Sequence, residues 1–470
     1  MRFIGKIFSL VLTVLFFITM YLIYRLNIVP TKYLLVIGVI LLVFVLIFDL
    51  KLISRRTRLG KRIFYIFLSS IFIGLIIYLL TYINATYDFM NNMVFNKLEI
   101  ITYDIVVDKS SSYKKIKDLS GLNMGYLDSD KNYSKLKLLI RKDIRYEEYY
   151  YKNINSMINS LEEEKNNSII IEDNYYEALK EEYDYLNDNT KVIKKYKLIV
   201  KKENKKEVKA STDKPFIVYI SGIDTYGKIS SVSRSDVNIV AVVNPVEEKI
   251  LLVSIPRDYY VLLHKNNEKD KLTHAGLYGI EESMNTIDDL LDIKIDYYLR
   301  LNFSTMTKSI DLLDGVDVYS DMTFNPTAKP SITIKEGVNH MDGEMALAFA
   351  RERYQYRTGD RHRGQNQQAI ITAVIKKMSN PSVIVKYKDL LDSLDGTFET
   401  NMDYKNITNL VKRQLDKNID WDVESISLDG KGSMMPTYSM GSRNLYVMIP
   451  DEKTIEVAKE KIDETLKGDE

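Results

Sequence analysis

The first 83 residues differ from the rest of the chain because they hold three long apolar runs. The runs cover residues 7–24, 33–50 and 63–83. Each is close to the roughly 20 residues that a helix needs to cross a bilayer. A cleaved signal peptide would give a single run followed by a small-residue cleavage site, and buried helices of a soluble protein are rarely so long and uninterrupted. Three runs therefore predict a permanent membrane anchor with three transmembrane helices at residues 1–83.

The loops between these runs predict how the chain is oriented. Residues 51–62 contain six Lys and Arg residues, whereas the connection between the first two runs has only Arg25 and Lys32. Basic loops stay on the cytoplasmic side of a membrane. We therefore expect a cytoplasmic N-terminus and 51–62 loop, with everything after about residue 84 outside the cell membrane.

From residue 84 to 210, short apolar strands alternate with polar, helix-like stretches. Strand and turn patterns cover 104–108, 118–130 and 168–173, and an amphipathic helix is expected at 175–186. The Lys- and Glu-rich stretch 201–215 ends in Pro215 and has the composition of a solvated linker. The pattern predicts a small accessory α/β domain and linker at 84–210, without a catalytic constellation.

The pattern beyond residue 211 becomes strongly α/β. Near-continuous apolar runs are typical of strands that are covered on both faces. The expected strands are 216–223, 237–244, 249–256, 297–303 and 315–322, and the expected helices are 279–292, 303–315, 342–350 and 365–380. Asp342 is placed to cap the third of these helices. Helices layered on a sheet are the natural architecture for this domain, at 211–465.

Composition narrows the chemistry. The 470 residues include no cysteine, which excludes thiol nucleophiles, Cys-ligated zinc and disulfides. The 65 basic and 64 acidic residues leave a net charge of +1, which argues against general attraction to nucleic acid. Four histidines are too few for much of a metal cluster, and phosphate-loop, zincin, nucleophile-elbow and dinucleotide-binding motifs are missing from the sequence.

Aspartates and arginines gather instead at the ends of the expected strands. Asp224 follows the first strand, Arg234 and Asp236 precede the second, and Arg257 and Asp258 follow the third. Strand ends are where α/β folds place ligands. If the chain is extended there, Arg234 and Asp236 point the same way because they are two residues apart.

A second group lies in 351–368, which holds five arginines in thirteen positions. Arg351 and Arg353 leave a short helix together, and Asp360, Arg363 and Gln367 follow. Arg363 and Gln367 are four residues apart and share one face of a helix. The other two arginines of the segment, Arg357 and Arg361, are expected to be bystanders.

The two groups together point to a phosphate ligand. A guanidinium matches phosphate oxygens in a bidentate way and keeps its charge. Aspartates beside an anion make sense if they hold a divalent ion such as Mg²⁺. Each element alone is commonly a turn, a cap or a surface pair, so the conjunction carries the argument. Arginines with metal-bearing aspartates are the requirements of phosphoryl transfer.

The sequence also resembles a known family. The segments "SRSDVNIVAVVNP", "SIPRDYYV", "KLTHAGLYG", "YYLRLNF", "LLDGVDVY" and "FARERYQYRTGDRHRGQNQQ" are similar, in this order, to motifs of the LytR-CpsA-Psr family, and most closely to its CpsA-type capsule proteins. The resemblance covers roughly 214–395, and 432–448 looks like the end of the same type of chain. Three anchoring helices and a small accessory domain before the catalytic domain also fit the CpsA-type layout.

The resemblance implies a fold, an activity and a site. The fold is a three-layer α/β/α sandwich with an apolar tunnel for a polyprenyl chain. The activity is a Mg²⁺-dependent (or Mn²⁺-dependent) extracytoplasmic phosphotransferase that moves a glycopolymer such as capsule or teichoic acid from undecaprenyl pyrophosphate onto peptidoglycan.

By motif, the metal carboxylates correspond to Asp224 and Asp236. The pyrophosphate-binding arginines correspond to Arg234, Arg257, Arg351, Arg353 and Arg363, with support from Asp360 and Gln367. The extra basic residues in "RHRG" leave Arg361 as an alternative to Arg363.

The expected mechanism is attack of a sugar hydroxyl on the sugar-proximal phosphorus, with loss of lipid monophosphate. Asp236 or Asp258 is expected to orient or deprotonate the hydroxyl, and the sequence does not decide between them. Two other functions stay open at this point. One is a non-catalytic receptor for lipid-linked polysaccharide, and the other, disfavoured by the short cytoplasmic loops, is a transcriptional attenuator.

Overall fold

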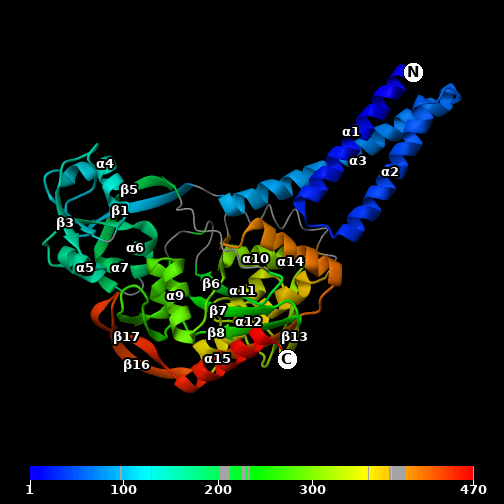
Figure 1. Ribbon diagram of the computed structural model, residues 1–470. Helices are drawn as coiled ribbons and strands as arrows, with labels where there is room; N and C mark the ends of the chain where they lie inside the picture. The colour runs from blue at the N-terminus through cyan, green and yellow to red at the C-terminus, as the bar shows by residue number, and fades with distance from the viewer. Residues whose placement is uncertain are drawn as a thin grey trace.

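The computed structural model describes residues 1–95, 98–128, 130–180, 183–201, 212–224, 229, 233–357, 359–380, 383 and 398–468. These residues form a helical bundle, a small α/β domain and a larger α/β domain (Figure 1). We call the second part the accessory domain (residues 98–201) and the third the C-terminal domain (residues 212–468).

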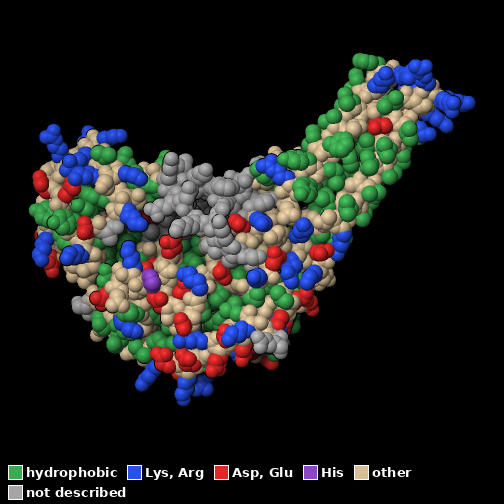
Figure 2. Space-filling model, in the orientation of Figure 1, with side chains coloured by type: hydrophobic (Ala, Val, Ile, Leu, Met, Phe, Trp, Pro, Cys, Tyr) green, Lys and Arg blue, Asp and Glu red, His purple; other side chains and the backbone are tan. Residues whose placement is uncertain are grey.

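The helical bundle projects away from the other two parts (Figure 1). Its helices are α1 (Arg2–Leu26), α2 (Thr31–Ile53) and α3 (Leu59–Phe95). All three are long and apolar enough to cross a membrane. Apolar side chains cover much of the visible bundle surface, and Lys and Arg side chains gather at its far tip (Figure 2). Helix α3 runs beyond residue 83, and its apolar segment ends at Tyr87.

The accessory domain is a five-stranded sheet in the order β3-β2-β4-β1-β5, with helices on both faces. Strand β2 runs parallel to β3 and β4, whereas β1 runs antiparallel to β4 and β5. The elements are β1 (Leu98–Asp108), η1 (Ile116–Leu119), β2 (Asn123–Leu127), α4 (Tyr133–Ile140), β3 (Glu147–Tyr151), α5 (Ile154–Glu162), β4 (Ser168–Glu172), α6 (Asp173–Lys180), α7 (Asp184–Asn189) and β5 (Thr190–Lys201). The helix expected at 175–186 is therefore two helices, α6 and α7.

The C-terminal domain is built on a six-stranded mixed sheet in the order β14-β11-β6-β7-β8-β15. Its strands and helices up to residue 378 are β6 (Phe216–Ile223), β7 (Val237–Asn244), β8 (Lys249–Ser254), β9 (Tyr260–Leu262), β10 (Lys269–Lys271), α8 (Leu272–Ala275), η2 (Gly276–Tyr278), α9 (Ile280–Leu291), β11 (Tyr297–Asn302), α10 (Phe303–Leu312), β12 (Val316–Ser320), β13 (Gly337–Met341), α11 (Gly343–Arg351) and α12 (Asp360–Met378). The remainder are β14 (Phe398–Thr400), α14 (Tyr404–Lys417), β15 (Asp422–Ser427), β16 (Gly430–Thr437), β17 (Gly441–Pro450) and α15 (Glu452–Lys467).

Helices cover both faces of this sheet. Helices α9 and α15 pack on one face, against alternate side chains of β6, β7 and β8. Helix α12 packs on the other face, where Ile371 and Ile375 meet the remaining side chains of the same strands. The expected three-layer α/β/α sandwich is thus confirmed, and the apolar character of the central strands follows from their burial on both sides.

Two details of the expected elements differ in the structure. Strand β12, expected at 315–322, pairs with β13 in a separate two-stranded sheet rather than joining the main one. Helix α12, expected from residue 365, begins at Asp360, so Arg363 lies in its first turn. The expected cap of α11 is present, because the Asp342 side chain accepts a hydrogen bond from the Met345 N–H at 2.8 Å.

Helix α14 holds the C-terminal domain against the base of the bundle (Figure 1). The Lys32 ammonium, in the first turn of α2, lies 2.6 Å from the Asp416 carboxylate. The Lys412 ammonium donates to the Asn27 side-chain oxygen, at the end of α1, at 3.1 Å. These contacts join the end of α1 and the start of α2 directly to the C-terminal domain.

Candidate active site

Three strand ends meet at one edge of the main sheet. Strand β7 is antiparallel to both β6 and β8, so its beginning lies beside the ends of its two neighbours. A small, partly open cavity lies at this edge, between the strand ends and the start of α12. The charged and amide side chains that line it are Asp236, Asn238, Arg257, Asp360, Arg361, Arg363 and Gln367. Of the ten predicted site residues, five line the cavity: Asp236, Arg257, Asp360, Arg363 and Gln367.

One ion pair of the cavity joins Arg257 to Asp236, with 2.6 Å between Nη1 and Oδ1. Burial opposes ionisation of the Asp236 carboxyl, but the charges of Arg257, Arg234 and Arg363 outweigh it and lower its pKa. Burial also opposes the charge on Arg257, yet Asp236 and Asp258 outweigh it and raise its pKa. Both groups are therefore charged at neutral pH.

One donor of Arg257 is left for a ligand. Its Nε atom is buried and makes no hydrogen bond to any residue that the structure describes. The nearest carboxylate oxygen, Oδ2 of Asp258, lies 3.7 Å away, beyond hydrogen-bond distance. A buried donor without a partner costs free energy, and an anionic oxygen would relieve that cost.

The first turn of α12 adds a second arginine. Arg363 pairs with Asp360 at 2.7 Å. Burial lowers the pKa of Arg363, Asp360 opposes this, and the positive charges of Arg257 and Arg353 lower it further. Guanidinium groups that repel one another at close range form a site that favours an anion. The positive end of the α12 dipole points the same way.

Close packing sets the place of α12. A Cβ atom on Gly364 would lie 2.6 Å from the Ser254 hydroxyl, so a larger residue here would require the Ser254 side chain to move. The buried amide of Gln368 donates to the carbonyls of Leu252 at 2.9 Å and Ile426 at 2.7 Å. Gln367 lines the cavity and donates to the Ala350 carbonyl at 3.4 Å. The helix is thus fixed to β8, β15 and α11.

The remaining predicted residues lie outside the cavity lining. Arg351 is 3.6 Å from the Asp224 carboxylate and stacks on Phe303 at 4.6 Å, with 39% of its side chain exposed. Arg353 donates to the Tyr354 hydroxyl at 2.6 Å, and its charge still acts on Arg363. The structure therefore divides the predicted site into a buried part at the cavity and a more exposed part beside it.

Two buried charged residues that contact the predicted site or its neighbours were missed in the sequence analysis. Lys271 is 7% exposed, and its Nζ atom lies 3.3 Å from Oδ1 of Asp258. Arg300 is 3% exposed and donates to the Ser233 hydroxyl at 3.0 Å, next to Arg234. A charge within the apolar strand "YYLRLNF" was a usable signal for Arg300, whereas the spacing around Lys271 carried none.

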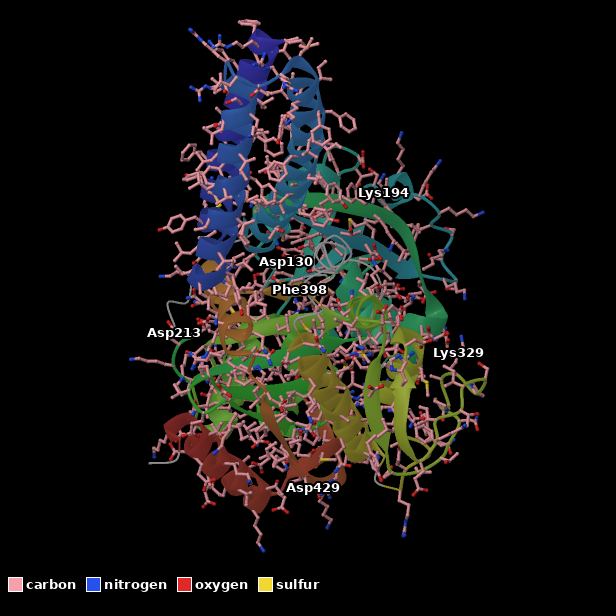
Figure 3. All side chains as sticks on the ribbon, turned by 90° about the vertical axis from the view of Figure 1, so that its right-hand side faces the viewer. Asp130, Lys194, Asp213, Lys329, Phe398 and Asp429 are labelled. Carbon is pink, nitrogen blue, oxygen red and sulfur yellow. The ribbon has the colours of Figure 1, made fainter. Side chains whose placement is uncertain are left out.

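Arg361 was expected to be a bystander, but it lines the cavity. Its guanidinium pairs with the Asp429 carboxylate at 2.6 Å. Asp429 lies at the end of the C-terminal domain away from the helical bundle, whereas Phe398 lies close to the bundle (Figure 3). This part of the cavity rim therefore faces away from the bundle.

The residues that the structure describes contain no group of three or more His, Cys, Asp or Glu side chains suited to a metal ion. Mg²⁺ rarely needs such a cage, because it is commonly bound by one or two carboxylates together with substrate phosphates. The Asp236 carboxylate is ionised and uses Oδ1 for Arg257. Its second oxygen fits the chemistry of a metal shared with a phosphate ligand.

Comparisons with known proteins agree on one family. The model of the LytR_cpsA_psr family matches residues 182–464. A polyisoprenyl-teichoic acid–peptidoglycan teichoic acid transferase TagU of Enterococcus faecalis is 30% identical over 220 residues, which is 46% of this chain and 71% of the relative. The TagU of Halalkalibacterium halodurans is 32% identical over 254 residues, or 53% and 79% of the two chains. The crystal structure of B. subtilis TagV is 28% identical, with a TM-score of 0.46 over 55% of this chain and 99% of that one.

Proposed function

The chain belongs to the LytR_cpsA_psr family, and on that premise we propose that it is a membrane-anchored phosphotransferase. It moves a glycopolymer from a polyisoprenyl pyrophosphate, such as undecaprenyl pyrophosphate, onto peptidoglycan. The names of the relatives, which are teichoic acid transferases, support this substrate class. The observation that carries the proposal is that Arg257 and Arg363 line one cavity, where the buried Nε donor of Arg257 makes no hydrogen bond to any described residue.

Pyrophosphate binding is the first task of the site. Arg257 and Arg363 supply charge from the buried part, and Arg234 adds to it. Arg351 and Arg353 belong to the exposed part, where a side chain is able to move onto an entering ligand. Guanidinium groups fixed before the ligand arrives stabilise developing phosphate charge without reorganising.

In the chemical step, an acceptor hydroxyl of peptidoglycan attacks the sugar-proximal phosphorus. A new bond forms between this phosphorus and the acceptor oxygen, and the bond to the bridging oxygen breaks. The bridging oxygen leaves with the lipid monophosphate, and the arginines stabilise the charge that develops on it. The hydroxyl proton passes to a carboxylate. We assign this role to Asp258, because Asp236 binds Arg257 through Oδ1 and would hold the divalent ion through its second oxygen, whereas Asp258 pairs with Lys271 through Oδ1 and its Oδ2 lies 3.7 Å from Arg257.

A divalent ion, Mg²⁺ or Mn²⁺, would be held by Asp236 and Asp224 together with the pyrophosphate. When bound, it would neutralise phosphate charge and polarise the phosphorus under attack. Asp224→Asn in the full-length protein is expected to raise the Mg²⁺ concentration needed for half-maximal transfer. An unchanged Mg²⁺ requirement would remove Asp224 from the metal site.

The orientation belongs to the same proposal. The basic loop at 51–62 supports a cytoplasmic N-terminus and an extracytoplasmic C-terminal domain. The chain has no cysteine, so single-cysteine variants give an unambiguous label. Ser54→Cys should be protected from an impermeant maleimide in intact cells, and Ser433→Cys should be labelled. The reverse pattern would overturn the orientation.

The decisive experiment is a turnover assay with purified protein, a polyprenyl-pyrophosphate-linked saccharide and a peptidoglycan acceptor. Wild-type protein is expected to release lipid phosphate, and Arg351→Ala or Arg353→Ala should abolish transfer while the fold is retained. Near-normal transfer by both variants would refute the site. Binding of the lipid-linked saccharide without release of lipid phosphate would identify a receptor instead.

A further inference from the structure

The accessory domain is packed firmly against the C-terminal domain. One apolar cluster crosses the boundary between them. Leu277, Met440 and Leu445 of the C-terminal domain are buried in it together with Tyr176 and Leu179 of helix α6. Burial of such side chains stabilises an interface by roughly 25 cal/mol for each Å² of apolar surface removed from water. The two domains therefore meet through a shared core.

A chain of buried hydroxyl groups runs through this boundary. The buried Tyr175 side chain on α6 interacts with that of Tyr278 across the boundary. The Tyr278 hydroxyl lies 2.9 Å from the Ser439 hydroxyl, which donates to Oδ2 of Asp270 at 2.5 Å. A carboxylate only accepts, so Ser439 donates to Asp270 and Tyr278 is left to donate to Ser439. We call these four residues the interdomain link.

Asp270 is a fully buried carboxylate whose neighbours satisfy it. It accepts hydrogen bonds from the backbone N–H groups of Ser439 at 2.9 Å and Lys271 at 2.7 Å. Nδ1 of His274 lies 2.6 Å from Oδ1 of Asp270, the same oxygen that accepts from Lys271. Low dielectric makes each of these contacts stronger than it would be in water, and it makes their loss costly. The carboxylate thus fixes β10, α8 and the β16–β17 turn to one another.

The other side of α8 touches the backbone of the transfer site. The Thr273 N–H donates to the Arg257 carbonyl at 2.8 Å, and the Thr273 carbonyl accepts from the Ser235 N–H at 3.2 Å. A Cβ atom on Gly276 would lie 2.4 Å from the Ser233 carbonyl oxygen, so the helix approaches that backbone as closely as glycine allows. Helix α8 therefore contacts the chain on both sides of Arg234 and at Arg257.

We propose that the accessory domain is a positioning element for the transfer site, acting through the interdomain link on the backbone that carries Arg234 and Arg257. The inference rests on the proposed function. None of the four link residues lines the cavity, so each acts through other residues. Small errors in the place of a charged group lower transition-state stabilisation steeply, because catalysis depends on groups that are fixed in advance.

The test uses conservative variants of the full-length protein in detergent. Tyr175→Phe and Ser439→Ala each remove one hydroxyl from the link. Tyr176→Phe is the matched control, because it removes a buried hydroxyl from the same helix, where its partner is Thr190 of the accessory domain at 2.7 Å. Three quantities are measured for each variant: the affinity for inorganic pyrophosphate by calorimetry, the kcat and KM of transfer, and the melting temperature by circular dichroism.

The link variants are expected to weaken pyrophosphate binding and to lower kcat/KM by about 2- to 30-fold, the range typical of coupling networks. Tyr176→Phe should lower the melting temperature and leave both functional measurements at the wild-type level. Wild-type pyrophosphate affinity and kcat/KM in both link variants would overturn the positioning role. An equal functional loss in Tyr176→Phe would also overturn it, since the cause would then be general destabilisation.

The pyrophosphate measurement separates this inference from the proposed function. If wild-type protein binds pyrophosphate but transfers nothing, the phosphotransferase proposal fails and the link variants still decide the positioning role through affinity. If wild-type protein transfers the polymer while the link variants match it in affinity and rate, only the positioning role fails. A wild-type protein that shows neither binding nor transfer would refute both.

Discussion

Two largely buried carboxyl groups, one in each α/β domain, differ in the positively charged groups that surround them. Asp236 at the cavity faces the guanidinium group of Arg257 at 2.6 Å. Asp104, in β1 of the accessory domain, is also buried, and the ammonium of Lys195 lies 3.2 Å from it. Lys195 pairs with Asp104 across β1 and β5, and it also contacts Asp173 at the start of α6.

The pKa values of the two carboxyl groups are shifted in opposite directions. Burial raises the pKa of Asp104 to about 7, and the neighbouring Asp173 carboxyl raises it more than Lys195 lowers it. At Asp236, burial has the same sense, but three arginines outweigh it and the pKa falls. The comparison teaches that several fixed guanidinium groups keep a buried carboxylate charged, whereas one shared lysine does not.

Within this comparison of the two carboxylates, the largest effect is expected from Arg257→Met, which would leave Asp236, like Asp104, without a bound guanidinium group. Loss of a fixed charge at a transition state costs about 100- to 1000-fold in kcat. Breaking the pair also leaves Asp236 buried without its partner, at a cost on the order of 3 kcal/mol in the free energy of unfolding. The transfer assay and chemical denaturation measure the two losses.

The double variant Arg257→Met, Asp236→Asn is the control for that prediction. It should regain most of the stability, because no unpaired charge is left buried, while transfer stays as low as in the single variant. A single variant with wild-type kcat would contradict the role of Arg257 at the site.

The next largest effect concerns the pH dependence of stability. Because the pKa of Asp104 is about 7 in the folded state and 3.8 ordinarily, the folded protein binds an additional proton between these values. This contribution to stability is complete below about pH 4 and is lost as the pH rises through about 7. Asp104→Asn should remove most of this loss of stability between these limits, measured by circular dichroism melts in detergent.

Asp236 should behave in the opposite way. Its pKa is lowered, so its contribution is present above the ordinary carboxyl pKa and is lost as the pH falls through the folded-state value. Asp236→Asn should therefore flatten only the acidic end of the profile. Parallel profiles for Asp104→Asn and wild type would show that Asp104 does not titrate in this window.

A smaller effect is expected from Lys195→Met, which sharpens the account of Asp104. Lys195 is half exposed, so its pair energies are about 1 kcal/mol or less after solvent screening. Its loss should raise the pKa of Asp104 further and shift the pH-dependent part of the melting profile upward. A profile shifted downward would mean that Lys195 does not stabilise the charged form.

The smallest effect is expected from Arg361→Ala. Its pair with Asp429 is solvent-exposed on both sides and is worth about 0–1 kcal/mol in stability. Transfer should fall far less than in Arg363→Ala, whose guanidinium is buried at the cavity. Equal losses of kcat/KM in the two variants would instead give Arg361 a share of pyrophosphate binding.

Much of the fold could be predicted because it depends on patterns within short segments. The three apolar runs, the continuous strands β6 to β8 and the Asp342 cap of α11 each reflect a local preference. The elements that differed depend on distant partners. Strand β12 pairs with β13 away from the main sheet, and α12 begins early because its first turn packs against β8 through Gly364.

By itself the sequence determined the kinds of groups that the site has to use. Asp and Arg residues at strand ends, together with the Arg-rich segment 351–368, were enough to indicate a phosphate site, and the family resemblance completed the ten candidates. Only the tertiary structure decided that Asp236, Arg257, Asp360, Arg363 and Gln367 line one cavity while Arg351 lies beside it. It also decided that Asp104 and Asp236 differ in pKa, because a charge shift depends on distances between residues that the chain order does not encode.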